Sequence, residues 1–253
     1  MNGRLPPPRI GAAPARLASR APCILVTGFS PFPGVPVNDS AILVAALRDA
    51  PPFGGAFARL HMAILPTDWG EAPARTRALI EELAPDLVLH FGVSVRARDF
   101  QIETRAFNVR RSSPDCAGRL PGGYYVKPSG PPVLDATLPA ALLVRQLNLA
   151  GIPASLSSNA GRYLCNATLY SSLLHGRSLP RPPRIGFVHI PALTPVECGD
   201  GAQNAAFDFS TLHDGAGLIL QTLARFMRSL PPPRYAAAPK SAKNRRGFVR
   251  ERK

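Results

Sequence analysis

The chain has 253 residues, 45% of them hydrophobic, and a formal net charge of +14 at pH 7. This length and apolar content suffice for one core of ordinary to large size, whereas no apolar run approaches the roughly 18 residues that a membrane-spanning helix needs. Most of the charge lies at the two ends, which argues against a groove built for phosphates and makes nucleic acid an unlikely partner.

The two ends differ in composition from the body of the chain. Residues 1–20 hold four arginines and no acids, and residues 231–253 hold eight Lys or Arg against one Glu. The N-terminal stretch lacks the continuous apolar segment of a secretory signal. We therefore expect a disordered leader over residues 1–21, one domain over residues 22–230 and a disordered basic tail over residues 231–253. The expected location is the cytoplasm, with no membrane partner.

The first half of the body alternates strands and helices. A β-branched apolar run opens it and leads into a Gly/Pro-rich loop, whose end can cap a helix through Asn38, Asp39 or Ser40. Proline at position 85 is expected to stop the second helix. The expected elements are a strand over 23–28, a helix over 41–50, a strand over 58–66, a helix over 69–85 and a strand over 86–94.

The second half continues this alternation after one irregular excursion. Residues 99–111 alternate well enough for a fourth strand or hairpin arm, and residues 112–139 are rich in Pro and Gly. Further on we expect a helix over 136–151, a strand over 152–158, a helix ending near 175–176, a strand over 184–191 and a helix over 209–230. The fold class predicted is α/β, a three-layer sandwich with a mainly parallel (mixed) central sheet and helices on both faces.

The cysteines and glycines exclude several kinds of site. The four cysteines lie far apart, with neither a CxxC pair nor zinc-ligand spacing around the five histidines: Cys23, Cys116, Cys165 and Cys198. Neither GxGxxG nor GxxxxGK[ST] is present, so no phosphate-binding loop is expected. The sequence thus predicts no disulfide framework, no metal and no cofactor.

One cysteine stands out by its position. Asn159-Ala160-Gly161 forms a small-residue turn, and Cys165 follows in the first turn of a predicted helix. Helix N-termini stabilise a thiolate, and their free N–H groups can also hold an oxyanion. Cys165 is therefore a candidate nucleophile, although a lone cysteine at a helix start is more often a small core residue.

A nucleophilic thiol needs a base, and two histidines qualify. His189 and His90 both lie near the carboxyl ends of predicted strands, and spacing alone does not separate them; each has a buried core histidine as its alternative. Glu103 lies on an otherwise apolar strand and can orient a histidine, unless it is a surface carboxylate paired with Arg105. There is no GxSxG elbow and no HExxH helix.

Three ordered stretches together resemble one family. "LVTGFSPFPGVPVNDS" (25–40), "SNAGRYLCNATLY" (158–170) and "GFVHIP" (186–191), with "HFGVSVRARDFQIETRAFN" (90–108) between the first two, are similar to the signatures of pyroglutamyl peptidase I, the pyrrolidone-carboxylate peptidases. The resemblance covers about residues 22–228. It implies a cysteine peptidase that removes N-terminal pyroglutamate from peptides by a Glu103–Cys165–His189 triad, often as a homo-oligomer.

The resemblance also implies a substrate pocket. Phe29 and Phe32 match the family's ring-clamping phenylalanines, with loop packing as their alternative, and Tyr163 and Leu164 match the remaining pocket wall. Val93 stands where many bacterial members place Gln. Arg110 and Arg111 follow "AFN", where the family carries an arginine near the oxyanion. The alternative function is an inactive family member that acts as a binding module, with a basic tail for anionic partners.

Overall fold

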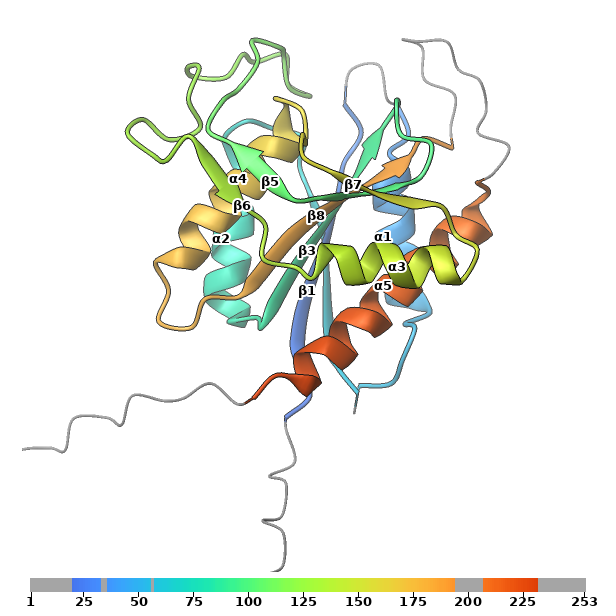
Figure 1. Cartoon of the computed structure of the whole chain (residues 1–253). Coiled ribbons are helices and arrows are strands. Elements are labelled where there is room, and N and C mark those ends of the chain that lie inside the picture. The colour runs from blue at the N-terminus through green and yellow to red at the C-terminus, as the bar shows by residue number, and fades with distance from the viewer. Residues whose placement is uncertain (1–19, 33–35, 56, 194–206, 232–253) are drawn as a thin grey trace, which may run out of the picture.

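A six-stranded sheet forms the centre of the molecule. The structure is a computed structural model that describes residues 20–32, 36–55, 57–193 and 207–231. The strand order is β2-β1-β3-β8-β4-β7 (Figure 1). The strands are β1 (Cys23–Phe29), β2 (Arg59–Leu65), β3 (Leu87–Ser94), β4 (Phe100–Glu103), β7 (Ala154–Ser157) and β8 (Arg184–Pro191).

The sheet is mixed, as the sequence predicts. β1 pairs in parallel with both β2 and β3, and β3 pairs in parallel with β8. β4 runs antiparallel to β8 and parallel to β7. β8, the last strand among the described residues, therefore lies in the middle of the sheet between β3 and β4, and its residues from Ile185 to Pro191 are buried.

Helices cover both faces of the sheet, which confirms the three-layer α/β class (Figure 1). One apolar cluster joins the sheet to α1 (Asp39–Asp49), α3 (Ala140–Leu149) and α5 (Phe209–Ser229). A second cluster, on the other face, joins it to α2 (Glu71–Leu83) and α4 (Leu164–Arg177). The central strands are apolar on both sides because each face of the sheet is covered.

Local sequence signals explain where several helices begin and end. Asn38 caps α1 by accepting a hydrogen bond from the Ser40 backbone N–H at 3.1 Å, and Asp208 caps α5 through the Thr211 N–H at 2.7 Å. The chain leaves α2 at Ala84, whose φ of 42° is left-handed, directly before the proline that the sequence analysis expects to stop this helix.

The region from 99 to 139 contains three short strands, where the sequence predicts one strand or hairpin arm followed by an irregular excursion. The strand is interrupted at Thr104, whose N–H donates to Ser157 O and whose carbonyl accepts from Ala136 N–H. These bonds divert it from β4 into β5 (Arg105–Phe107), which leaves the main sheet and pairs with β6 (Val133–Asp135) in a separate antiparallel ribbon. β6 is too short for its alternation to be visible among the surrounding prolines.

Three expectations fall wholly or mostly outside the described residues. These are the leader over 1–21, the tail over 231–253 and the environment of Cys198. Within the described ranges, no helix combines the length and the apolar character needed to cross a bilayer.

Candidate active site

The turn before α4 places Cys165 at the start of the helix. Gly161 has a φ of 77°, which glycine adopts without strain, and its N–H donates to Asn159 Oδ1 at 3.1 Å. Tyr163 is the N-cap of α4, and no side-chain cap bond is made there within the described residues. The first N–H groups of the helix are thus left for other acceptors beside Cys165, whose side chain is only partly exposed.

His189 and Glu103 form a buried pair across two antiparallel strands. In the β4–β8 register, His189 lies opposite Gln101 and Phe187 lies opposite Glu103, so His189 and Glu103 are diagonal neighbours on one face. His189 Nδ1 lies 2.8 Å from Glu103 Oε1, and the two side chains are 8% and 0% exposed. With Nδ1–H donating to the carboxylate, Nε2 is free to face a thiol.

Cys165 completes this arrangement from α4, which packs on β8. Burial by itself lowers the pKa of His189, but the charge of Cys165, a hydrogen bond with its thiol, and the hydrogen bond and charge of Glu103 outweigh it and raise that pKa to about 9. The structure therefore brings Glu103, His189 and Cys165 together. An imidazolium stabilised in this way is the partner that a thiolate needs.

His90, the other candidate base, lies in a different environment. Its Nδ1 is 2.7 Å from Thr27 Oγ1 and its Nε2 is 3.1 Å from Ser172 Oγ. Burial lowers the pKa of His90 to about 3, so the ring is neutral at physiological pH. Both ring nitrogens are engaged by hydroxyl groups, and His90 is a core histidine.

Two residues that the sequence analysis did not select complete the surroundings of the thiol. The Phe187 ring centroid lies 4.7 Å from that of His189 and 6.0 Å from that of Phe29. A Cβ added to Gly92 would lie 2.5 Å from Phe187 Cζ and 3.3 Å from Cys165 Sγ. The signals were present: Phe187 alternates with His189, and an isolated glycine inside a strand often marks a close approach.

Tyr163 lies in an aromatic cluster beside the thiol. Its ring centroid is 5.9 Å from that of Phe32 and 5.1 Å from that of Trp69, which it meets edge-on. The Arg111 guanidinium carbon lies 5.0 Å from the centroid of the same ring. Burial, followed by the charge of Asp115, raises the pKa of Tyr163 to about 12, so the phenol keeps its proton.

The other expected pocket residues have different surroundings. Phe29 and Leu164 are buried in the apolar cluster on the α2 and α4 face. Val93 is partly buried and packs against the cluster on the opposite face, which contains α1, α3 and α5. Phe32, Tyr163 and Val93 are thus partly exposed, whereas Phe29 and Leu164 are buried, and of the three only Val93 packs toward the α1, α3 and α5 face.

An asparagine next to the thiol fixes the neighbouring loop. Asn166 is fully buried, accepts from the Phe107 N–H at 2.8 Å, and donates to the carbonyls of Phe107 and Val109 at 2.8 and 2.9 Å. The following residue, Arg110, donates to Tyr125 O at 2.7 Å. The segment that follows β5 is thus held against the first turn of α4.

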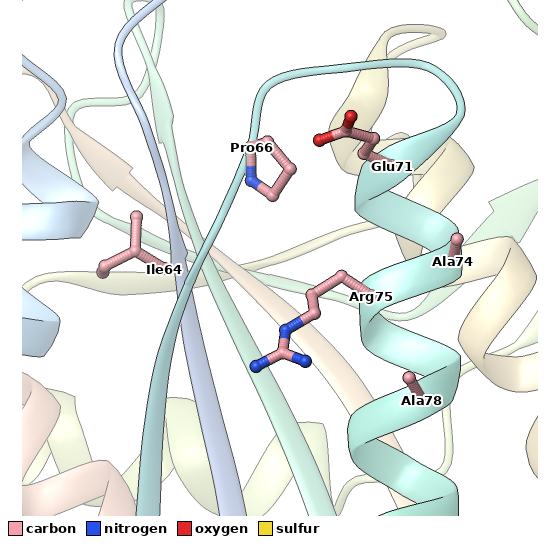
Figure 2. Close-up of a pocket in the computed structure, with 6 residues that line it drawn as sticks. All are labelled: Ile64, Pro66, Glu71, Ala74, Arg75 and Ala78. Atoms are coloured by element: carbon pink, nitrogen blue, oxygen red, sulfur yellow. The ribbon is translucent and has the colours of Figure 1, made fainter.

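A separate hollow of about 490 Å³ lies between β2 and α2 (Figure 2). Figure 2 shows Ile64 and Pro66 on one side of it and side chains of α2 on the other. None of the candidate site residues lines it, so the chemistry described above takes place elsewhere. Over the described ranges, no group of three or more His, Cys, Asp or Glu side chains is arranged to hold a metal ion.

The site combines a thiol at a helix start with an imidazole and a carboxylate, within a three-layer α/β fold. This combination defines a class of protein, the cysteine hydrolases. A sequence model described as pyroglutamyl peptidase matches residues 23–209. The chain belongs to the pyroglutamyl peptidase family.

Individual relatives agree with this assignment. The chain is 38% identical over 171 residues to a pyrrolidone-carboxylate peptidase of Escherichia fergusonii, covering 67% of this chain and 78% of that protein. It is 34% identical over 201 residues to the pyrrolidone-carboxylate peptidase of Gloeobacter violaceus, covering 79% and 96%. The crystal structure of Bacillus amyloliquefaciens pyroglutamyl peptidase I superposes with a TM-score of 0.72 at 26% identity, covering 81% of this chain and 97% of that one.

Proposed function

We propose that this chain is a cysteine omega-peptidase that hydrolyses the bond between an N-terminal pyroglutamyl residue and the rest of a peptide. The observation that carries the proposal is the buried His189–Glu103 pair next to the partly exposed thiol of Cys165. Membership of the pyroglutamyl peptidase family supports the substrate class. No observation on the described residues favours the alternative of an inactive binding module.

The mechanism follows from the order of the three groups. His189 Nε2 takes the thiol proton, and Cys165 Sγ attacks the pyroglutamyl carbonyl carbon to form a tetrahedral oxyanion. The imidazolium then gives its proton to the leaving amine as the C–N bond breaks and a thioester forms. Water, deprotonated by His189, hydrolyses the thioester to free pyroglutamate and restores the thiol. Glu103 holds the imidazole in the required tautomer and stabilises its charge.

Recognition of the substrate rests on an apolar slot, because the lactam ring is compact and carries no charge. Phe32 and Tyr163 supply the aromatic walls, and the buried Phe29 and Leu164 support them from the core. The Val93 side chain packs toward the other face of the sheet, so this residue contributes to the pocket through its backbone at the carboxyl end of β3.

The same proposal covers the setting of the enzyme. One catalytic domain spans residues 22–230, with leader 1–21 and basic tail 231–253 outside it. The free thiols of Cys23, Cys116 and Cys165 suit a reducing compartment, the cytoplasm. The family resemblance suggests a homo-oligomer, which light scattering on the purified chain measures directly. The substrates are peptides with N-terminal pyroglutamate, and neither a metal nor a cofactor takes part in the steps above.

Release of a fluorescent amine from a pyroglutamyl arylamide tests the function. We expect turnover in the wild type and a loss of at least about 10³-fold in Cys165→Ser and His189→Ala, because the nucleophile and the base act as a unit. Cys23→Ser is the matched control, since burial raises the pKa of the Cys23 thiol and keeps it unreactive. Unchanged turnover in Cys165→Ser would contradict the proposal.

A further inference from the structure

The loop from Arg111 to Arg119 lies against the expected pocket wall, Tyr163. The Tyr163 hydroxyl donates to Pro114 O at 2.8 Å, and the Arg111 guanidinium stacks on the same ring. The Arg111 backbone N–H donates to Arg162 O at 2.8 Å. The position of Tyr163, two residues before the thiol, therefore depends on the position of this loop.

A buried carboxylate organises the loop. Asp115 is 1% exposed, and its Oδ1 accepts hydrogen bonds from the Ala117 and Arg119 N–H groups, both at 2.9 Å. Its Oδ2 accepts from the Trp69 N–H at 3.3 Å and lies 3.7 Å from Arg119 Nε. A buried charge is tolerated only when donors surround it, and here the donors come from the loop itself and from the segment that precedes α2.

Further bonds tie the loop to the connection between β2 and α2. Trp69 Nε1 donates to Ser113 O at 2.9 Å, and the Cys116 N–H donates to Thr67 O at 2.9 Å. Arg119 also pairs with Asp68, a second buried carboxylate that accepts from the first N–H groups of α2. Asp115 thus lies at the junction of the loop, Trp69 and α2, while Trp69 meets the edge of Tyr163.

We propose that Asp115 is a positioning residue for the peptidase reaction: it fixes the 111–119 loop and Trp69, and through them holds Tyr163 in place as a wall of the pyroglutamyl pocket. This inference rests on the proposed function. Asp115 acts on how tightly the lactam ring binds, because the described contacts of its carboxylate are with the loop, Arg119 and Trp69 and not with the His189–Glu103 pair. A role confined to stability would lower the melting temperature without changing substrate affinity in the folded enzyme.

Kinetics of Asp115→Asn separate these two roles. We expect KM for a pyroglutamyl arylamide to rise about tenfold and kcat to change by less than about threefold, because a binding wall is lost while the reacting groups stay in place. Cys116 is an exposed thiol that iodoacetamide would also alkylate, so it is replaced by serine in both proteins for this measurement. The rate at which iodoacetamide alkylates Cys165 should then be the same with Asp115 and with Asn at position 115. Asp86→Asn is the matched control: Asp86 also binds a backbone N–H and an arginine, but at the amino end of the sheet.

A second variant tests whether Asp115 acts through Tyr163. Tyr163→Phe keeps the ring and loses the bond to Pro114, so its KM should also rise. If both residues act through the same wall, the double variant should have a KM close to that of Asp115→Asn alone. Multiplicative effects of the two substitutions on KM, or an unchanged KM in Asp115→Asn, would overturn the inference.

The fluorescence of Trp69 gives a readout that needs no turnover. Trp69 is the single tryptophan of the chain and is 7% exposed. In folded Asp115→Asn we expect its emission to shift to longer wavelength and acrylamide to quench it more strongly, with no such change in Asp86→Asn. If the wild type does not hydrolyse pyroglutamyl substrates, the proposed function fails; if the wild type is active but the Trp69 emission of Asp115→Asn is unchanged, the positioning role fails.

Discussion

At the scale of single residues, the charge state of His189 decides when the site is competent. The pKa of His189 is raised to about 9, against the cost of burial, by Cys165 and Glu103. The imidazolium of His189 should therefore persist up to about that pH and lose its proton above it, which removes the acid that protonates the leaving amine. We predict that the basic limb of the kcat/KM profile lies near pH 9.

Glu103→Gln tests this cause directly. Loss of the carboxylate charge removes a contribution that raises the pKa of His189, so the basic limb should move to lower pH. The kcat should fall by on the order of 10²–10⁴-fold, because the imidazole loses the group that fixes its tautomer. Glu81→Gln is the control, because it leaves the site untouched and removes only the contact between the exposed Glu81 carboxylate and the largely buried His175 of α4. A basic limb at the same pH in Glu103→Gln would show that another group sets it.

Residue patterns alone identified candidates for the site but not its assembly. Cys165 was selectable because a glycine turn precedes a helix, whereas His189 and His90 were equivalent until the hydroxyls of Thr27 and Ser172 were seen to occupy both nitrogens of His90. Trp69 and Asp115 carried no local signal. Their importance comes from contacts between segments that are distant in the sequence.

At the scale of elements, His90 connects three of them. It lies on β3 and bonds to Thr27 on β1 and to Ser172 on α4. We predict that His90→Gln retains kcat/KM within about threefold and loses about 1–3 kcal/mol of unfolding free energy, because buried hydroxyl partners are left poorly matched. Urea unfolding and the arylamide assay measure both quantities on the same preparation. A loss of activity in the folded variant, comparable to that of His189→Ala, would show that His90 takes part in the chemistry.

The same histidine gives the stability a pH dependence. Because the pKa of His90 is about 3 in the folded chain and near 6.5 when unfolded, the unfolded state takes up the proton first as the pH falls. The contribution of neutral His90 to the free energy of unfolding is therefore fully present above pH 6.5 and declines toward pH 3. Between pH 7.5 and 5.5 this decline is about 1 kcal/mol. This decline should be absent from His90→Gln.

The strands and helices were largely predictable because central strands and amphipathic helices carry clear apolar patterns. The direction of β4 was not. Alternation identifies a strand, whereas its direction depends on how residues 95–99 turn the chain back and on the break at Thr104 that releases β5. The antiparallel direction of β4 brings Glu103 next to His189. The strand direction, which local patterns could not predict, is therefore what forms the buried pair.

At the scale of the whole molecule, Glu103, Cys165 and His189 all lie within the part of the chain that the family model matches. We predict that removal of residues 232–253 leaves kcat/KM within about twofold of the full chain. The same truncation removes seven net positive charges and should lower the salt needed to elute the protein from heparin. The kcat/KM and the heparin elution of the full chain and the truncated chain are compared on fractions of the same oligomeric state from size-exclusion chromatography. Loss of activity would place the C-terminal residues inside the catalytic domain.

The insertion of β8 between β3 and β4 has a consequence for the newborn protein. Cys165 leaves the ribosome before His189, and β3 and β4 have no partner along the seam between them until β8 arrives to fill it. A nascent chain therefore carries its thiol without its base. The peptidase therefore lacks its base during the part of its synthesis that precedes β8, and we expect activity only after β8 has paired with β3 and β4.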